Sequence, residues 1–328
     1  MPKDNVFFDL IDRIVCLDVG GRGVAGMFEP ARALVNGSLS LAAANQLAQL
    51  QSGDTVFIIT GSLTRASVSP EIAENDGPIG SAVLARALSQ GFNAIPVIIV
   101  DASICNRVAK MVEFSGLNVV SYEQAKAATS LPRFTGIAVM ENGAIEDEAA
   151  RQVATNLLDI YAPKAVVACE RAGISADGTY RNALGQDYSE GREKLDYIVE
   201  FASKRGLPTI GIGDGGNEIG MGAVKEAVAT HIPHGEVLCA EMATDVLIPA
   251  GVSNWGCYAV VAALAILKKN PKLAHTPEAE RRLLDFSPAA GLVDGMSGML
   301  DATGDGMHPD VHASVVELLS QTVRRALS

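Results

Sequence analysis

Short apolar runs recur along the chain, and most of them end in a glycine or in a polar side chain. Apolar runs of this length, flanked by turn residues, are typical of strands that are buried on both faces of a parallel sheet. We predict strands at residues 13–19, 55–60, 94–100, 117–120, 135–140, 164–169, 207–213 and 244–249.

Between these runs, apolar residues return every three or four positions, which predicts helices. The predicted helices are residues 38–51, 81–90, 103–114, 145–160, 190–204, 223–230, 257–268, 277–286 and 311–327. Strands that alternate with helices indicate an α/β fold, a mainly parallel sheet with helices on both faces in a three-layer, doubly wound arrangement. No repeat or shift in composition marks a boundary, so we predict a single domain over residues 1–328.

The net charge and the composition argue against two kinds of binding partner, nucleic acids and membranes. The net charge is −12 and no run of lysines or arginines is present, which argues against a nucleic-acid partner. No apolar run reaches the roughly 18 residues of a membrane span, so no membrane partner is expected. Five cysteines lie far apart without a C-x-x-C pair, which is typical of reduced thiols in a cytoplasmic protein. The subunit number stays open, with a homo-oligomer among the alternatives.

Residues 211–222 read Gly-Ile-Gly-Asp-Gly-Gly-Asn-Glu-Ile-Gly-Met-Gly and lie between a predicted strand and a predicted helix. Ligands bind at this end of the strands in open α/β sheets. The acids Asp214 and Glu218, with the amide Asn217, suit a divalent cation such as Mn²⁺ or Mg²⁺, or a substrate ammonium group. The glycines that would let a ligand approach the backbone are Gly215 and Gly216.

Two other interpretations of residues 211–222 stay open. Asp214 is also a good helix N-cap, and Glu218 is a favourable charge for a first helical turn. The glycines at 211, 213 and 216 fit the dinucleotide pattern G-x-G-x-x-G, although here the pattern begins inside the strand.

Other polar side chains also follow predicted strands. They include Asp18, Arg22, Thr60, Asp76, Glu170, Arg171, Ser253 and Asn254. Parallel strands place their carboxyl ends along one edge, so we expect Asp18, Asp76, Glu170 and Asp214 to lie along that edge. A nucleophile elbow, a P-loop and a zinc motif are absent from the sequence, which favours a site built from oxygen ligands.

The glycine-rich segment 211–222 resembles the signature of the D-glutamate cyclase-like C-terminal domain family. Further segments agree with that family in order, at residues 18–23, 60–61, 75–80, 170–171, 177–178 and 249–256. The resemblance covers nearly the whole chain. It implies a hydro-lyase that cyclises D-glutamate, or a close acidic amino acid, to 5-oxo-D-proline with loss of water.

The resemblance, together with the chemistry of the side chains, supplies a set of expected roles. Asp214, Glu218 and Glu170 are the expected catalytic groups, and Asp214 and Glu218 are also the expected metal ligands. Arg22 or Arg171 would bind the substrate carboxylate, unless each forms a structural ion pair with a neighbouring acid. The expected substrate-binding residues are Asp18, Gly21, Arg22, Thr60, Asp76, Arg171, Gly215, Gly216, Asn217, Ser253 and Asn254.

Two further expectations concern the loops and the class of protein. We expect residues 172–189 to cover the substrate, and Trp255 to pack beneath residues 211–222 while Asn254 faces the site. The alternative to an enzyme is a non-catalytic module that binds an amino acid or a nucleotide with the same glycine-rich loops.

Overall fold

The computed structural model describes residues 5–328, and in this part of the chain seven strands form one sheet. The strands are β1 (Thr55–Thr60), β2 (Ile95–Ile99), β3 (Asn118–Val119), β4 (Ile137–Glu141), β5 (Val166–Cys169), β6 (Thr209–Gly213) and β7 (Val246–Pro249). Their order is β3-β4-β2-β1-β5-β6-β7, and every neighbouring pair is parallel. The predicted α/β class with a parallel sheet is therefore confirmed.

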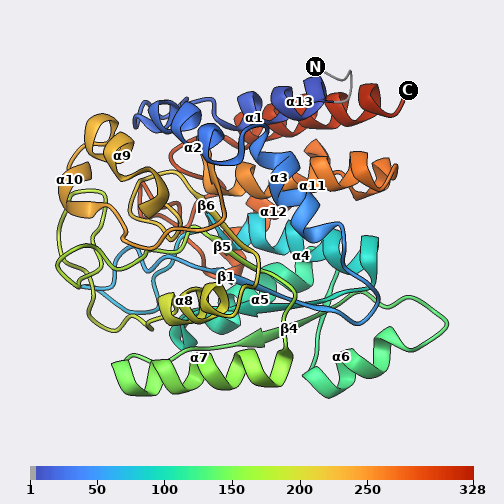
Figure 1. Cartoon of the computed structure of the whole chain (residues 1–328), viewed down its shortest axis with the longest axis horizontal. Helices are drawn as coiled ribbons and strands as arrows, with labels where there is room; N and C mark the ends of the chain where they lie inside the picture. The colour runs from blue at the N-terminus through green and yellow to red at the C-terminus, as the bar shows by residue number, and fades with distance from the viewer. Residues whose placement is uncertain (1–4) are drawn as a thin grey trace.

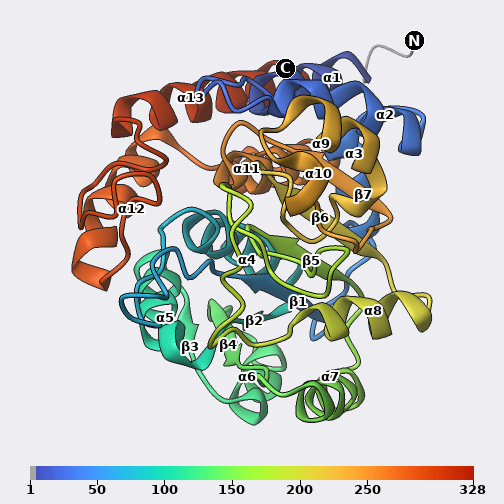
Figure 2. The same ribbon diagram turned by 90° about the vertical axis from the view of Figure 1, so that its left-hand side faces the viewer.

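Helices cover both faces of this sheet (Figure 1). One face packs against α6 (Tyr122–Thr129), α7 (Asp147–Tyr161) and α8 (Asp196–Lys204). The other face carries α3 (Leu39–Leu47), α4 (Pro78–Phe92), α5 (Cys105–Phe114) and α11 (Ser253–Leu267), while α12 (Pro277–Ala290) packs outside α5. A further pair, α1 (Asn5–Val15) and α13 (Pro309–Ala326), packs outside α11 and adds a layer on this side (Figure 2). Shorter helices are α2 (Phe28–Val35), α9 (Lys225–His231) and α10 (Gly235–Leu238).

The helix α11 is the centre of the thicker side of the molecule. Its residues from Ser253 to Ala265 are buried, as expected of a helix that is apolar all round. Its first turn lies against the first turn of α4, where a Cβ on Gly80 would come within 2.7 Å of the Asn254 Cα. Glycine at position 80 therefore lets the two helix ends approach, and both of these ends point to the same edge of the sheet.

The strand predicted at residues 13–19 is wrong, because α1 continues to Val15 and a turn follows it. Phe8, Ile11 and Val15 are buried at helical spacing, whereas Leu10 on the opposite face is exposed. In the sequence, the apolar residues at the end of the buried face of α1 are followed directly by apolar residues of the next turn. Together they form an unbroken apolar run, which resembles a strand. Asp18 and Arg22 therefore follow a helix and not a strand.

The connections after β1 run in opposite directions across the sheet. β1 lies between β2 and β5, so the chain first moves to one side of β1 and later crosses to the other. The loops after β1 and β5 consequently diverge, and such a switch point leaves a crevice at the carboxyl ends of the strands.

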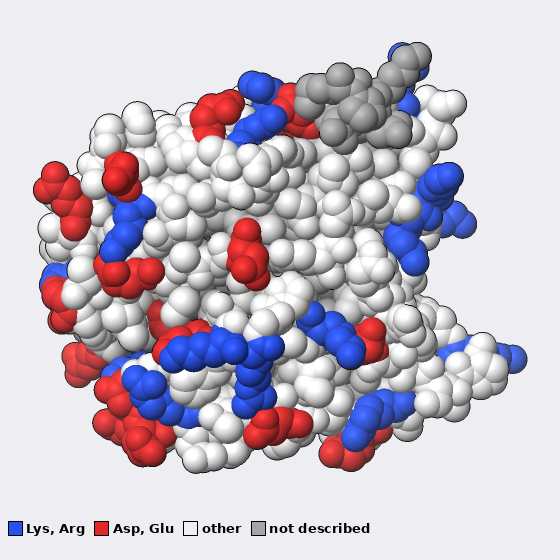
Figure 3. All heavy atoms as spheres, viewed as in Figure 1, with Lys and Arg blue, Asp and Glu red and all other residues white. Residues whose placement is uncertain are grey.

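Two observations concern the outside of the molecule. Over residues 5–328 we find no helix that is both long and apolar enough to cross a membrane. On the face drawn in Figure 3, acidic (red) and basic (blue) side chains are interspersed.

Candidate active site

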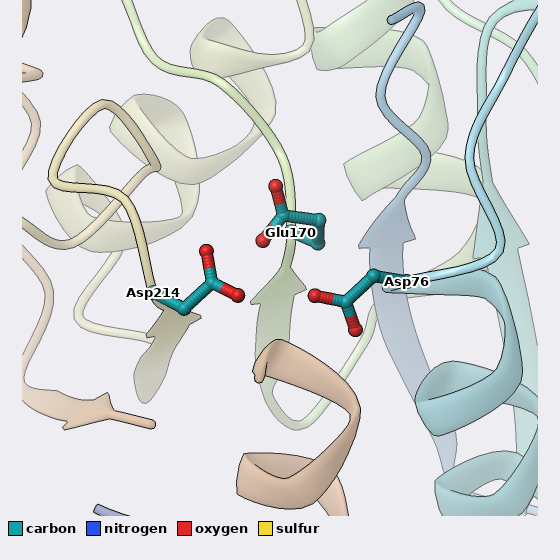
Figure 4. A group of neighbouring side chains, drawn as sticks. All are labelled: Asp76, Glu170 and Asp214. Atoms are coloured by element: carbon teal, nitrogen blue, oxygen red, sulfur yellow. The ribbon is translucent and has the colours of Figure 1, made fainter. Parts of the chain in front are cut away.

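Three carboxyl groups converge at the switch point of the sheet. Asp76 lies in the loop between β1 and α4, Glu170 directly follows β5, and Asp214 directly follows β6. One oxygen from each of the three side chains lies within 4.8 Å of the other two (Figure 4). The structure thus brings together three of the four acids that were expected on one edge.

The carboxylate of Asp76 is held by the beginning of α11. Its oxygens accept hydrogen bonds from the backbone N–H groups of Ser253 (3.0 Å), Asn254 (2.8 Å) and its own neighbour Gly77 (3.0 Å). Helix N-termini favour anions. Burial nevertheless raises the pKa of Asp76 well above its ordinary value, and the nearby carboxyls of Asp305 and Asp214 raise it further.

Glu170 adopts a left-handed backbone conformation, with φ of 46°, which is uncommon for a residue with a side chain. The Ser253 hydroxyl donates a hydrogen bond to its carboxylate. Burial raises the pKa of Glu170 well above its ordinary value, and the acids Asp214 and Glu218 add to this effect. A proton is therefore favoured on this side chain.

The loop after β6 is shaped by Glu218. Its Oε1 accepts the backbone N–H groups of Asp214 (2.8 Å) and Gly215 (2.6 Å), whereas its Oε2 is buried and has no hydrogen-bond partner among residues 5–328. Asn217 secures the same loop, since its Nδ2 donates to the backbone carbonyl of Arg181 at 2.8 Å. Gly216 has a φ of 92°, which other residues rarely adopt.

Arg22 is the cation that joins this cluster. Its Nη2 donates to Asp214 (2.7 Å), to Asp305 (2.7 Å) and to the backbone carbonyl of Gly251 (3.0 Å). No hydrogen bond within residues 5–328 engages its Nε or Nη1. Asp18 accepts the backbone N–H of Arg22 at 2.9 Å, so it shapes the turn that presents the guanidinium.

A cavity of about 360 Å³ opens above the carboxyl cluster. Six of the predicted site residues line it, namely Gly21, Arg22, Glu170, Asp214, Gly215 and Asn217. The segment predicted to cover the substrate contributes Asn182, Leu184 and Tyr188 to the wall.

Two acids in the cavity wall were not predicted from the sequence. Burial, with Asp214 as the next cause, raises the pKa of Asp305 to about 7. Burial, with Asp305 as the next cause, raises the pKa of Glu74 to about 8. The available signals were the glycine-rich segment that contains Asp305 and the polar turn that begins at Glu74, but neither directly follows a strand.

Several predicted site residues lie outside the cavity wall. Arg171 is fully buried in an ion pair with Asp101 and also donates to the backbone carbonyls of Gly61 and Glu193. Thr60 is buried, and its hydroxyl has no hydrogen-bond partner in the described chain. The remaining residues outside the wall are Asp18, Asp76, Gly216, Glu218, Ser253 and Asn254.

The expected placement of Asn254 and Trp255 is wrong. The Oδ1 of Asn254 accepts the backbone N–H groups of Gly77 (3.0 Å) and Gly80 (2.5 Å), so this side chain caps α4. Trp255 is fully buried and its indole N–H donates to His312 on α13 at 3.0 Å, on the far side of α11 from the sheet. Both residues thus support the two helices that lead into the site.

The open parallel sheet, with an acidic cavity at its switch point, defines a doubly wound α/β protein whose cavity lies where sheets of this kind bind their ligands. The family model "D-glutamate cyclase-like, C-terminal" matches residues 11–320, and the chain belongs to this family. It is also 36% identical over 260 residues to human "D-glutamate cyclase, mitochondrial". That alignment covers 78% of this chain but only 38% of the human protein, so the chain spans well under half the length of this relative.

Proposed function

We propose that this chain is an enzyme of the D-glutamate cyclase type, a hydro-lyase that converts D-glutamate to 5-oxo-D-proline and water. The observation that carries the proposal is the convergence of Asp76, Glu170 and Asp214 beside Arg22 at the base of the acidic cavity. The family and the name of the human relative support the same reaction.

The reaction moves protons and needs no oxidant or reductant. The α-nitrogen of glutamate attacks the carbon of its own γ-carboxyl group, a C–N bond forms, and a C–O bond breaks. Two protons leave the ammonium group, and two protons end on the departing oxygen, which becomes water. The site must therefore take protons from nitrogen and give protons to oxygen within one short molecule.

The carboxyl cluster offers groups for both tasks. Burial raises the pKa of Asp214 above its ordinary value, but Arg22 opposes this rise and stabilises the ionised form, which makes Asp214 the better proton acceptor of the cluster. Burial and like charges favour the protonated form of Glu170, which makes it the better proton donor for the leaving oxygen. Glu218 is engaged with the backbone through Oε1, so we assign it to holding the loop.

Arg22 also offers a place for the substrate. Its Nη2 is fixed by three acceptors, and either its Nε–H or an Nη1–H remains to donate a single charged hydrogen bond to a carboxylate of D-glutamate. The acids around the cavity attract the ammonium group and repel the two carboxylates of the substrate. The protons that the raised pKa values of Asp76, Glu170, Asp305 and Glu74 retain weaken this repulsion.

We further propose that a divalent cation, Mn²⁺ or Mg²⁺, binds between Asp76, Glu170 and Asp214. Oxygen ligands of an octahedral ion at about 2.1 Å are separated by roughly 3 to 4.3 Å, and the three oxygens of the cluster lie within 4.8 Å of one another. A bound cation would polarise the γ-carboxyl group and favour the ionised form of all three acids, so Glu170 would be a ligand when the cation is bound and a proton donor only in the cation-free site. The sequence predicted Asp214 and Glu218 as the metal ligands, but Glu218 lies outside this group of three. In the proposed site, Asp76 and Glu170 take its place beside Asp214.

The test is production of 5-oxoproline from D-glutamate, measured by mass spectrometry with L-glutamate as the stereochemical control. Asp214→Asn should abolish product formation, whereas Asp159→Asn, on the exposed face of α7, should not change it. Protein dialysed against a chelator should lose activity and regain it with Mn²⁺ or Mg²⁺. Full activity after dialysis would contradict the cation alone, and normal turnover by Asp214→Asn would contradict the whole assignment.

A rise in the melting midpoint with D-glutamate, without any product, would instead indicate the non-catalytic binding module.

A cytoplasmic location and a homo-oligomer stay predictions.

A further inference from the structure

A buried histidine connects the helical side of the molecule with the acidic cavity. His312, on α13, and Trp255, on α11, are both fully buried. The Trp255 Nε1–H donates to the Nδ1 of His312 at 3.0 Å, and the two rings lie edge to face with centroids 5.6 Å apart. Because Nδ1 accepts this hydrogen bond, it carries no proton.

The other ring nitrogen of His312 contacts the segment that enters the cavity. Its Nε2 lies 3.0 Å from the backbone carbonyl oxygen of Gly304. A carbonyl oxygen can only accept, so Nε2 carries the proton and the imidazole is in its neutral Nε2–H form. A Cβ on Gly304 would lie 3.1 Å from the His312 ring, so glycine allows this close approach.

Gly304 directly precedes Asp305, which has a left-handed backbone with φ of 50°. The Asp305 carboxylate accepts the Nη2 of Arg22 at 2.7 Å, and the same Nη2 contacts Asp214. His312 thus holds the peptide group from which the Arg22-binding carboxylate projects. The neighbouring backbone is held separately, since Asn75 donates to the carbonyl of Thr303 at 2.8 Å.

We propose that His312 is a positioning residue, which fixes Asp305 on Arg22 through the carbonyl of Gly304. Its effect on turnover rests on the proposed function, but the link itself does not. The groups that face the imidazole are the Trp255 indole on α11, the Gly304 carbonyl, and Glu280 on α12, whose Oε1 lies 4.0 Å from Nδ1.

Glu280 is itself bound through Oε2 to Tyr258 and His275. If Nδ1 of His312 also carried a proton, it would face the indole N–H of Trp255, and two donors cannot hydrogen-bond to each other. The contact with Trp255 therefore requires the neutral imidazole.

Two isosteric variants separate the two hydrogen bonds of the ring. In His312→Gln the side-chain amide nitrogen reaches the position of Nε2 and can still donate to Gly304. In His312→Asn the side-chain oxygen takes the position of Nδ1 and can accept from Trp255, but the side chain no longer reaches the Gly304 carbonyl, which keeps the backbone N–H of Met307 at 2.9 Å. We expect His312→Gln to keep kcat within about threefold and His312→Asn to lose about tenfold or more, since small displacements of catalytic groups cost this much.

The separation of kcat from KM gives a readout that a loss of stability would not move. An Asp305 that has moved away from Arg22 no longer holds the guanidinium in place for the substrate carboxylate. KM for D-glutamate should therefore rise in His312→Asn and stay unchanged in His312→Gln. Equal losses in the two variants, or a normal KM in a folded His312→Asn, would overturn the proposal.

Trp255 allows the same link to be tested without any substrate. It is the only tryptophan in the chain, so protein labelled with ¹⁵N-tryptophan gives one indole N–H resonance. This resonance should shift in Asp305→Asn, which weakens the contact with Arg22 next to Gly304, and should keep its position in the exposed control Glu71→Gln. An unchanged resonance in Asp305→Asn would overturn the link, whatever the substrate of the enzyme is.

Discussion

The Nη2 of Arg22 and the Oδ2 of Asp214 lie 2.7 Å apart, although 192 residues separate them in the chain. The first belongs to the turn after α1, and the second to the loop after β6. Their contact offsets negative charge on one side of the acidic cavity, because Arg22 is the one cation that the structure shows hydrogen-bonded to Asp214 and Asp305 within residues 5–328.

Arg22→Lys should lower kcat/KM for D-glutamate by about ten- to a hundredfold. A lysine has one terminal nitrogen where arginine has three, so it cannot hold Asp214 and Asp305 and also present a second nitrogen to a carboxylate, and each charged hydrogen bond contributes roughly 1.5–3 kcal/mol. Steady-state kinetics will measure the effect, with the exposed Arg205→Lys as the control. Unchanged kcat/KM in Arg22→Lys would remove this residue from substrate binding.

Stability should depend on pH through Asp305 and Glu74. Their pKa values rise from 3.8 to about 7 and from 4.5 to about 8, so between about pH 4 and pH 8 the folded protein holds more protons than the unfolded chain. Their contribution to the free energy of unfolding is therefore largest at low pH and is lost as the pH rises through the folded values.

Urea denaturation at several pH values, compared between wild type, Asp305→Asn and Glu74→Gln, will measure this contribution. Each variant should show a smaller fall in the free energy of unfolding from pH 5 to pH 8 than the wild-type protein. Glu71→Gln, on an exposed side chain, is the control. Parallel curves for all four proteins would show that neither buried acid binds a proton on folding.

Arg171→Met should destabilise the fold by about 3–5 kcal/mol, because it leaves Asp101 buried without its partner. The exposed pair between Arg205 and Asp159 provides the comparison, and Arg205→Met should cost less than about 1 kcal/mol. The free energy of unfolding from chemical denaturation decides the matter. A stable Arg171→Met that binds D-glutamate poorly would return Arg171 to the substrate-binding role expected from the sequence.

Asn254→Ala should cost about 1–2 kcal/mol of stability, because the backbone N–H groups of Gly77 and Gly80 lose their acceptor. Asn156→Ala, on the exposed side of α7, is the matched change without a cap. If thermal melts show the two variants to be equally stable, the capping contact makes no net contribution.

The strands that lead into the site were predictable from the sequence, and so were three of the acids. β1, β5 and β6 are buried on both faces and therefore read as unbroken apolar runs. Glu170 and Asp214 directly follow such strands, where a parallel sheet gathers polar groups. Asp76 stands in a polar turn that leads into α4.

Other members of the site depend on how distant segments fold back, which local patterns do not encode. Asp305 reaches the cavity from a segment that contains no strand, and Asp18 shapes a turn after a helix that resembles a strand. Glu170 and Arg171 are neighbours, yet the first faces the cavity and the second turns toward Asp101. Adjacency in sequence could not distinguish these two directions.

The distance along the chain between the partners of Arg22 has a consequence for folding. Asp305 lies 283 residues after Arg22, and Asp214 lies between them in sequence. The loop that closes this contact encloses the entire sheet, so the entropic cost of forming it is met only after the strands have paired. Ligand binding should therefore return last when the denatured protein refolds, and no fragment cut between β1 and β7 should hold the complete site.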